Sequence, residues 1–245
     1  MHKISWLRHE VRSLFNYLLP PACALCLEPL LPAEPDSLCQ NCTTQIIPLK
    51  RSSCPRCALP YPSKYDGDHF CQTCLLEKKP LFTGVTSVGY YDGLLRDAIH
   101  RFKYRNNINL DRPLAAMLTD LLNQKDICCD MVIPVPLHRN KLRQRTYNQS
   151  ALIARKLAHR MNLPVKLNLL KRIKQAPPQQ SLSARDRLQN VRGAFTLDKK
   201  LHDQSILLVD DVMTTGATAR ECARTLLKGG AGSIQIAILA RAALR

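Results

Sequence analysis

The hydrophobic pattern of this chain changes near residue 80. Beyond that point, apolar segments alternate between two kinds of spacing. Some are short β-branched or continuously apolar runs typical of strands, and others have apolar residues every three or four positions, as in amphipathic helices. The predicted strands are 83–91, 130–136, 205–209 and 233–240, and the predicted helices are 94–104, 114–122, 148–160 and 217–228.

This alternation predicts an α/β fold, built as a mostly parallel sheet with helices on both faces. Asn148 is a suitable cap for the helix that follows it, and Gly229-Gly230 is a suitable stop for another. In sheets of this kind, ligands bind in the crevice outside the carboxyl ends of the strands. We therefore expect functional residues where the predicted strands end.

Two segments before residue 80 have other patterns. Residues 1–19 predict one amphipathic helix, which either packs on the protein body or lies on a membrane surface. Residues 20–80 are rich in Pro and Cys and lack long periodic segments, as expected where a metal replaces a hydrophobic core. With a boundary near Lys79-Pro80, the predicted domains are 1–19, 20–80 and 81–245.

Eight of the eleven cysteines form four Cys-x-x-Cys pairs within the first third of the chain. The two-residue spacer lets both thiolates of a pair bind one tetrahedral zinc ion, and a second pair completes a four-cysteine site. The alternative is a disulfide framework in a secreted domain. Two zinc ions bound in sequential order is the simplest arrangement, while a cross-braced pairing or a single site stays open. The eight predicted ligands are Cys23, Cys26, Cys39, Cys42, Cys54, Cys57, Cys71 and Cys74.

The N-terminal segment favours zinc over disulfides. It carries charges inside its apolar stretch and lacks the continuous apolar core and small-residue cleavage site of a secretion signal. No run in the chain approaches the roughly 20 apolar residues of a membrane span. We therefore expect a cytosolic protein with reduced thiols. His69 competes weakly as a metal ligand, and Cys128, Cys129 and Cys222 lack metal-site spacing and are predicted to be buried or incidental thiols.

The formal net charge of +17 is unevenly distributed. Residues 1–80 contribute +2 and residues 81–245 contribute +15. Residues 139–192 alone hold 14 Lys or Arg against one acid, Asp186. A solvated helix face usually alternates its signs, and this segment does not. Such a concentration of positive charge suits a polyanion such as diphosphate or nucleic acid.

The segment 205–218, SILLVDDVMTTGAT, carries the sharpest chemical signal. An apolar strand is predicted to end at Val209 on two carboxylates, which can accept hydrogen bonds from a ribose diol. A turn of small and hydroxyl residues then leads into a helix, whose N-terminus and backbone N–H groups favour a phosphate. The simpler alternative is an ordinary strand–loop–helix connection with a Thr cap. The candidate residues are Asp210, Asp211, Val212, Met213, Thr214, Thr215, Gly216, Ala217 and Thr218.

This segment closely resembles the 5-phosphoribosyl-1-diphosphate loop of type I phosphoribosyltransferases. The resemblance implies that Asp210 and Asp211 bind the ribose hydroxyls and that the loop from Thr214 to Thr218 surrounds the 5-phosphate. It also implies Mg2+ bridging the diphosphate and ribose oxygens. The family often has Glu at the first acidic position, so the side chain of Asp210 is one methylene shorter than the usual one. Ligand binding tolerates this change more easily than an acid–base role does.

A second candidate region follows strand 130–136, in the run IPVPLHRNKLRQRTYNQS. In type I phosphoribosyltransferases the loop after the corresponding strand receives the diphosphate, and Arg side chains suit phosphate oxygens. The alternative is a basic helix start that faces solvent. The residues predicted to contact diphosphate or DNA are Val135, Pro136, His138, Arg143 and Arg145, together with Lys103.

A third candidate region, residues 176–192, is polar and lacks periodicity, which predicts a long loop. A mobile loop of this kind can close over a ligand and exclude water from the reacting carbon of the ribose. A disordered linker is the alternative. Arg185 and Arg187 are the predicted diphosphate or DNA contacts in this loop.

The order of these motifs carries a fuller resemblance. Four Cys-x-x-Cys pairs, FKY (102–104), VPLHRNKLRQRTYNQS, QSLSARDRLQNVRGAF and VDDVMTTGAT follow one another as in the ComF family, which includes the GntX-type proteins. The likeness covers nearly the full length, from about Leu18 to Arg241. Family members typically have Arg-Gly-Phe-Asn-Gln at 145–149, where this chain has Thr146 and Tyr147 in place of Gly and Phe. The backbone shape of this loop therefore stays open.

The resemblance implies a zinc-ribbon N-terminus, a phosphoribosyltransferase-like domain and a role in natural competence or in the use of external DNA. In that pathway, incoming single-stranded DNA is handled on the cytoplasmic side of the membrane with a helicase-type partner. The expected location is therefore cytoplasmic, with peripheral contact at the inner face of the membrane left open.

Three functional readings follow. The chain is an active phosphoribosyltransferase with an unidentified base or nucleotide acceptor, a DNA-uptake factor that uses the fold as a phosphate cradle, or a regulator that senses phosphoribosyl diphosphate. The sequence specifies the sugar-phosphate donor better than any acceptor, and no DNA-binding helix-turn-helix is evident. We expect a DNA-uptake protein that binds phosphoribosyl diphosphate, and an active phosphoribosyltransferase is the alternative.

Overall fold

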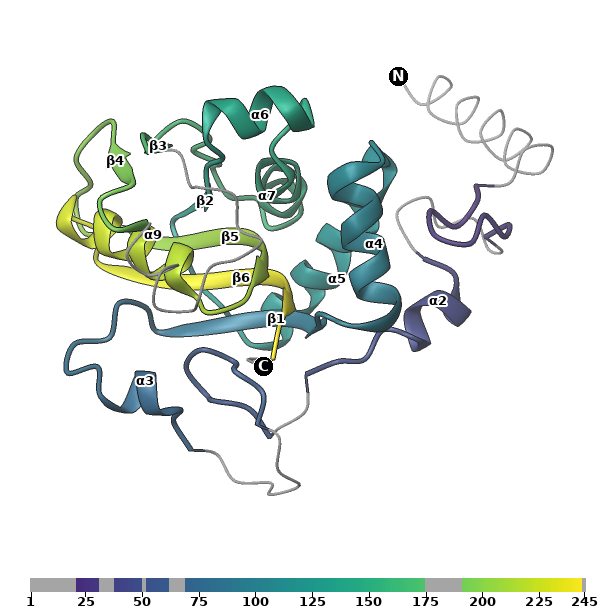
Figure 1. Cartoon of the computed structure of the whole chain (residues 1–245), viewed down its shortest axis with the longest axis horizontal. Helices are drawn as coiled ribbons and strands as arrows, with labels where there is room; N and C mark the ends of the chain where they lie inside the picture. The colour runs from purple at the N-terminus through teal and green to yellow at the C-terminus, as the bar shows by residue number, and fades with distance from the viewer. Residues whose placement is uncertain (1–20, 31–37, 50–51, 62–68, 175–190, 244–245) are drawn as a thin grey trace, which may run out of the picture.

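The structure is a computed structural model. It describes residues 21–30, 38–49, 52–61, 69–174 and 191–243 (Figure 1). The predicted helix 1–19 lies outside the described residues. The same holds for most of the predicted loop 176–192, including Arg185 and Arg187.

The centre of the fold is a four-stranded sheet in the order β1-β6-β5-β2, in which every pairing is parallel. This confirms the predicted parallel α/β architecture. The strands run over Gly84–Tyr90 for β1, Met131–Pro134 for β2, Ser205–Met213 for β5 and Ser233–Arg241 for β6.

Helices cover both faces of this sheet, as predicted. Leu207 and Val209 of β5 pack in one cluster with three helices, whereas Ile206 and Leu208 pack against a fourth helix on the opposite face. Alternate residues of a strand point to opposite faces, so a run of apolar residues in β5 fills both cores. The first face holds α4 (Gly93–Tyr104), α5 (Asp111–Gln124) and α7 (Gln149–Arg160), and the second holds α9 (Ala217–Lys228) (Figure 1).

The predicted helix boundaries follow their capping residues. The side chain of Asn148 accepts a hydrogen bond from the backbone N–H of Ser150 at 3.1 Å and so caps α7. Gly229 ends α9 as expected. A short 3-10 helix, Ile108–Leu110, leads into α5, and α6 covers Arg139–Arg145. None of the residues of α6 is buried, as the alternative of a solvent-facing basic helix anticipates.

One strand end was predicted wrongly. The sequence places the end of the strand at Val209, but β5 continues to Met213. Asp210 pairs with Ile238 of β6, and the pairing extends to Met213 and Arg241. Because β5 lies between β6 and β2, sheet pairing outweighs the poor strand propensity of Asp.

A small antiparallel hairpin escaped the sequence analysis. It consists of β3 (Leu170–Arg172) and β4 (Phe195–Leu197). Each strand has three residues, which is too short for the alternation that reveals a strand.

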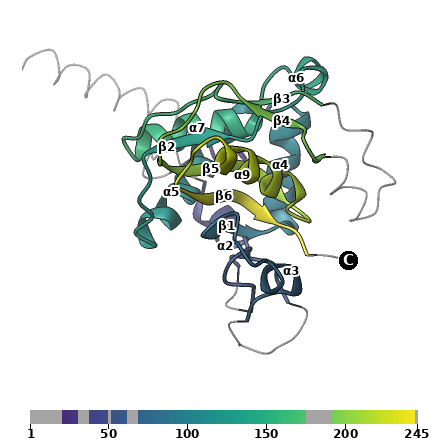
Figure 2. The ribbon, with the colours of Figure 1, turned by 90° about the vertical axis from the view of Figure 1, so that its left-hand side faces the viewer.

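The cysteine-rich segment attaches to both layers of the fold. Cys23 and Cys42 pack in the cluster that holds α4, α5 and α7, whereas Cys54 and Cys74 pack in the cluster that holds α9. Its two short helices are α2 (Gln40–Thr44) and α3 (Gln72–Leu75), and Figure 2 shows α3 on the far side of β1 from the other strands. In the part of the chain that the structure describes, no helix has the length and apolar character needed to cross a membrane.

Candidate functional site

Eight cysteines form two separate four-sulfur clusters in the N-terminal segment. In each cluster the sulfur atoms all lie within 4.8 Å of one another. The clusters follow sequence order, which confirms the sequential pairing and excludes the cross-braced one. The first consists of Cys23, Cys26, Cys39 and Cys42, and the second of Cys54, Cys57, Cys71 and Cys74.

The two clusters are built in the same way. Leu27 and Ala58, each directly after a Cys-x-x-Cys turn, have positive φ angles of 66° and 54°. Their backbone N–H groups bond to the carbonyls of Cys23 and Cys54, respectively, which closes the turn. The third cysteine of each cluster stands at the start of a short helix, α2 or α3. Each site therefore joins a tight turn to a helical turn.

The donor set and its spacing fit zinc. Zn–S bonds of about 2.3 Å in a tetrahedral site place sulfur atoms about 3.8 Å apart. The Cys26 and Cys39 sulfurs lie 3.4 Å apart, and those of Cys57 and Cys71 lie 3.5 Å apart. Burial opposes ionisation of Cys54, but backbone N–H groups outweigh it and lower the pKa of that thiol to about 6. Each cluster brings four cysteine sulfurs together, which is a complete tetrahedral zinc ligand set.

The remaining predictions about cysteines also hold. Cys222 is buried in α9, Cys128 is exposed and Cys129 is half-buried, and none of them belongs to a cluster. His69 stacks on the ring of Tyr61, with centroids 4.0 Å apart, and is not among the residues of the metal clusters.

Asp210 and Asp211 lie near the carboxyl end of β5, and two helices hold them there. Ser150 Oγ at the start of α7 donates to Asp210 Oδ1 at 2.9 Å. Lys103 Nζ near the end of α4 lies 2.8 Å from Asp211 Oδ1. Burial, reinforced by the neighbouring Asp211 carboxylate, raises the pKa of Asp210 to about 7. Lys103 was predicted to contact diphosphate or DNA, and the structure makes it the direct partner of the acid pair.

Lys103 is held in place by contacts between the segment 102–104 and the residues that follow α6. Tyr147 donates its hydroxyl hydrogen to the carbonyl of Phe102, and the two rings lie 5.9 Å apart. Gln149, fully buried, reaches the carbonyl of Lys103 at 3.5 Å. The FKY segment is therefore fixed by the loop after α6. Arg145 completes this contact: its Nη2 donates to the Tyr104 hydroxyl at 2.8 Å, and its guanidinium lies 4.8 Å from the Tyr104 ring centroid.

The loop between β5 and α9, with the first residues of α9, is the segment Thr214–Thr218 that the sequence predicts to surround a phosphate, and it is termed the phosphate loop. Gly216, at the N-terminus of α9, has a φ angle of 78°, and an added Cβ would lie 2.5 Å from the Met213 side chain. The backbone conformation favours Gly, whereas the nearest atom is the flexible end of the Met213 side chain, which can move away. Thr214 is exposed, and Thr215 and Thr218 are half-buried. A helix N-terminus flanked by hydroxyl groups suits a phosphate.

The acid pair has more basic neighbours than the sequence analysis anticipated. Burial lowers the pKa of Lys141, and the nearby charges of Arg172, Arg145 and Lys103 lower it further. Burial also lowers the pKa of Arg172, while the negative charge of Asp210 opposes that shift. Arg172 belongs to β3 and was missed because its strand is so short. Its only sequence signal is its place in the basic segment 139–192.

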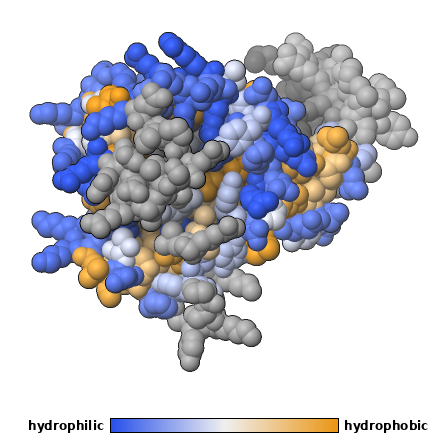
Figure 3. All heavy atoms as spheres, in the orientation of Figure 1, coloured by the Kyte–Doolittle hydropathy of each residue, from blue (hydrophilic) through white to orange (hydrophobic). Residues whose placement is uncertain are grey.

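Other predicted contacts lie less directly at the acid pair. His138 caps α6, where its Nδ1 accepts from the backbone N–H of Asn140 at 3.3 Å. Arg143 is exposed on α6, and Figure 3 shows the hydrophilic surface that gathers over this helix. Val135 is buried and donates its backbone N–H to the carbonyl of Val209, next to half-buried Pro136.

The second cysteine cluster is connected to the phosphate loop by Arg241 and to α9 by Arg220. Arg241, only 2% exposed, donates to the carbonyl of Cys57 at 3.0 Å and to that of Met213 at 2.8 Å, and it also contacts the carbonyl of Thr214. Arg220, in the second turn of α9, reaches the sulfur of Cys74 at 3.3 Å. The sequence predicted neither contact.

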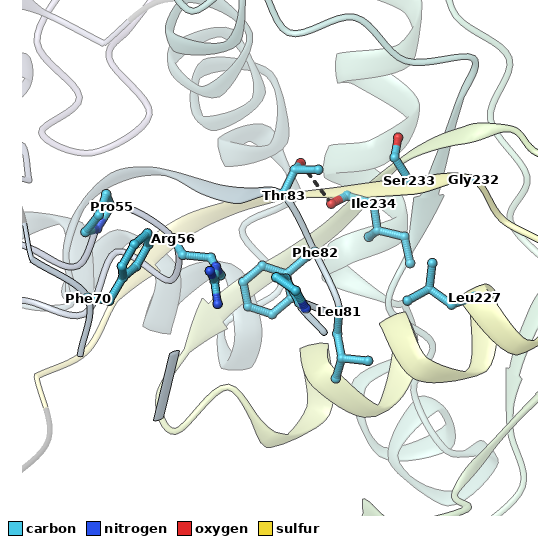
Figure 4. A pocket seen from close by; sticks show the side chains of 11 residues that line it. Pro55, Arg56, Phe70, Leu81, Phe82, Thr83, Leu227, Gly232, Ser233 and Ile234 are labelled. Atoms are coloured by element: carbon cyan, nitrogen blue, oxygen red, sulfur yellow. Dashed lines mark hydrogen bonds between the residues drawn. The ribbon is translucent and has the colours of Figure 1, made fainter. Parts of the chain in front are cut away.

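A separate cavity of about 550 Å³ lies between α9 and the segment that carries the second cysteine cluster, termed the second ribbon (Figure 4). Arg56 and Phe70 line it from the ribbon, Leu227 from α9 and Ile234 from the start of β6. It contains none of the predicted site residues and opens at the amino ends of the strands. It is therefore distinct from the site at the strand carboxyl ends.

Comparison with known families identifies two parts of the chain. Residues 14–75 match the family described as "Double zinc ribbon domain". Residues 148–244 match the family described as "Phosphoribosyl transferase domain". The first match covers both cysteine clusters, and the second covers β5, the acid pair and the phosphate loop.

Among solved structures, the fold is similar to a purine phosphoribosyltransferase from Pyrococcus horikoshii, with 20% identity, a TM-score of 0.34 and coverage of 52% of this chain and 70% of that one. Among curated proteins, the chain is 34% identical to competence protein F of Haemophilus influenzae over 216 residues, which are 84% of this chain and 91% of the relative. It is 31% identical to DNA utilization protein YhgH of Salmonella typhi over 91% of this chain and 98% of the relative. It is 26% identical to competence protein ComFC of Bacillus subtilis, covering 85% of this chain and 86% of the relative. With its two zinc-ribbon clusters, its phosphoribosyltransferase domain and these relatives, the chain belongs to the ComF family of competence and DNA-utilization proteins.

Proposed function

We propose that this protein binds 5-phosphoribosyl-1-diphosphate with Mg2+ and acts in DNA uptake, handling incoming single-stranded DNA on the cytoplasmic side of the membrane. The observation that carries the ligand assignment is the Asp210–Asp211 pair, held by Lys103 and Ser150 at the carboxyl end of β5 beside the phosphate loop. Carboxylates accept from ribose hydroxyls, and the N-terminus of α9 favours the phosphate.

The residues around this pair suit the rest of the ligand. Mg2+ takes oxygen ligands and is usually held by one or two carboxylates together with substrate phosphates, which Asp210 and Asp211 would supply with the diphosphate. Lys141, Arg145 and Arg172 carry positive charge toward the same region and suit the diphosphate oxygens. When bound, the metal would neutralise ligand charge. The chain's own residues orient the sugar and its phosphates.

The DNA assignment rests on charge and on the relatives. Residues 139–192 hold 14 basic side chains against one acid, which suits a polyanion. Relatives at 31–34% identity are named competence protein F and DNA utilization protein. We also propose a helicase-type partner that passes single-stranded DNA to this protein or receives it.

The two cysteine clusters would each hold one structural zinc ion. Four thiolates within one small volume are a zinc ligand set, and the metal would cross-link the turn and the short helix that supply its ligands.

The test of the ligand site is calorimetry of the purified protein with phosphoribosyl diphosphate and Mg2+. We expect saturable binding in the wild type and none in the double variant Asp210→Asn with Asp211→Asn. That variant loses the ion pair with Lys103 and should be less stable, so its zinc content and folded state are checked at the assay temperature. Wild-type affinity in that variant would overturn the site assignment. The uptake role is tested by transformation frequency in Haemophilus influenzae that lacks competence protein F and carries this gene.

A second candidate function is turnover, the transfer of the ribosyl phosphate to a base or nucleotide. The pKa of about 7 at Asp210 favours it, because a carboxyl group near neutrality can exchange a proton with an acceptor. Release of diphosphate that depends on an added base would support it. Binding without such release across purine and pyrimidine bases would leave the domain as a ligand-binding module.

A further inference from the structure

A second cationic site lies between α5 and α7, away from the phosphate loop. It is a depression of about 510 Å³ formed by the first turn of α5 and the outer face of α7. Its lining consists of basic side chains with one acid and one leucine. The lining residues are Asp111, Arg112, Leu152, Arg155, Lys156, His159 and Arg160.

Helix geometry separates this depression from the phosphoribosyl diphosphate site. Leu152, Arg155, Lys156 and His159 are spaced i, i+3, i+4 and i+7, so they lie on one face of α7. Ser150, on the opposite face, is buried and bonds the acid pair. One face of α7 therefore contacts the acid pair, and its opposite face lines the depression, so the helix separates the two sites.

The depression carries an excess of positive charge. Lys156 lies 3.9 Å from Asp111, and Arg160 lies 3.9 Å from Asp120. The Arg160–Asp120 pair is long and exposed, so it is weak and readily exchanged for another partner. The Lys156–Asp111 pair is equally long, although its carboxylate is buried. Arg155 is exposed and has no ion-pair partner among the residues that the structure describes. Four cations, with Arg112 of α5 included, therefore line the hollow with one carboxylate, Asp111. Asp120 contacts Arg160 but is not part of the lining.

A helix face that only contacts solvent usually alternates its charges and does not form a depression. Here cations from two helices converge on one hollow, and their mutual repulsion is relieved by a bound anion. The absence of aromatic side chains from the lining removes the usual platform for base stacking. Contacts would then fall on the sugar–phosphate backbone, which carries no sequence information.

We propose that this depression binds the sugar–phosphate backbone of single-stranded DNA at a site separate from that of phosphoribosyl diphosphate. The inference rests on the proposed DNA-handling function and gives that function a location. It has two consequences. DNA binding is independent of base sequence, and the sugar phosphate does not displace DNA.

The experiment compares two charge-matched double variants by fluorescence anisotropy with a labelled oligothymidine, at several salt concentrations and constant Mg2+. Arg155→Gln with Arg160→Gln removes two cations from the depression. Lys199→Gln with Lys200→Gln removes two exposed cations from the turn after β4. We expect the first variant to bind about tenfold more weakly and to lose roughly 1.4 from the slope of log affinity against log salt, at about 0.7 per phosphate contact. We expect the second variant to match the wild type, and both to bind phosphoribosyl diphosphate normally in calorimetry.

Each outcome decides a different point. If both variants bind the oligonucleotide like the wild type, the location is wrong and the DNA-handling function stands. If the wild type binds no oligonucleotide, both the location and the function fall. Displacement of bound oligonucleotide by saturating phosphoribosyl diphosphate, at the same Mg2+ concentration, overturns the separation of the two sites.

Discussion

Arg241 and Cys57 are joined by a hydrogen bond of 3.0 Å from the guanidinium Nε to the backbone carbonyl. The same guanidinium bonds the carbonyls of Met213 and Thr214, where the phosphate loop begins. Burial lowers the pKa of Arg241, and the thiolates of the second cysteine cluster oppose that shift by attracting the positive charge. The buried Arg241 side chain thus joins the second cysteine cluster to the phosphate loop, although the two are far apart in the sequence.

Arg241→Gln should therefore weaken ligand binding as well as stability. The substitution removes the bonds to buried carbonyls, and each unsatisfied buried group costs about 1–3 kcal/mol. We expect the free energy of unfolding to fall by about 2–4 kcal/mol and the affinity for phosphoribosyl diphosphate to fall about tenfold, because the loop loses its support. Chemical denaturation and calorimetry measure the two effects.

Arg96→Gln is the matched control for that substitution. Arg96 is exposed on α4 and its guanidinium lies 3.9 Å from the equally exposed Asp97, so both quantities should stay at their wild-type values. A loss of stability in Arg241→Gln with unchanged ligand affinity would show that the bond to Cys57 does not support the loop.

The metal clusters should lose zinc independently. Because Cys23 and Cys54 belong to different four-sulfur clusters, Cys23→Ser and Cys54→Ser should each lower bound zinc from two ions to one per chain. Each variant should unfold at a lower temperature, since the metal cross-links the turn and the short helix that supply its ligands. Atomic absorption measures the zinc content. His69→Ala is the control and should keep two ions. Loss of both ions in either serine variant would mean that the clusters bind zinc as one unit.

The long elements of the fold and the cysteine clusters could be predicted because their signals are local. Helix α7 has an apolar face and an Asn148 cap. Each Cys-x-x-Cys motif indicates a metal site from four consecutive residues. The end of β5 could not be predicted from local preference. Asp210 is a poor strand residue, and only its pairing with Ile238 keeps it in the sheet.

The missed site residues share a physical reason. Arg172 acts from a three-residue strand whose partner, β4, lies more than twenty residues further along the chain. The buried guanidinium of Arg241 donates to carbonyls from two other segments, Cys57 and Met213–Thr214. A charged side chain in such a place leaves no periodic trace in the sequence. Only the three-dimensional fold brings its partners together.

Ligand binding should depend on pH through Asp210. Its folded-state pKa of about 7 lies above the ordinary value near 3.9. The carboxylate form, which would hold the ribose and Mg2+, therefore becomes dominant only as the pH rises through about 7. We expect the affinity for phosphoribosyl diphosphate to rise about tenfold from pH 6 to pH 8 at constant Mg2+, as measured by calorimetry. A flat profile would count against Asp210 as a ligand group.

The stability of the free protein should change in the opposite direction. A raised carboxyl pKa contributes stability that is complete below the ordinary value near 4 and is lost as the pH rises to about 7. Asp210→Asn cannot ionise, so it should lose less stability than the wild type between pH 4 and pH 7. Urea denaturation at several pH values measures this difference. Equal losses in the two proteins would place the titration elsewhere.

Thr146 carries backbone strain that a glycine would relieve. It ends α6 with a φ angle of 62°, in the left-handed region that β-branched residues avoid. The ComF family typically has Gly at this position, which fits the conformation seen here. We expect Thr146→Gly to raise the free energy of unfolding by about 1 kcal/mol, since relief of strain exceeds the added freedom of the unfolded chain. Thr146→Ala removes the branching but keeps a Cβ, so it should gain less. A less stable Thr146→Gly would mean that the Thr side chain contributes more than its backbone conformation costs.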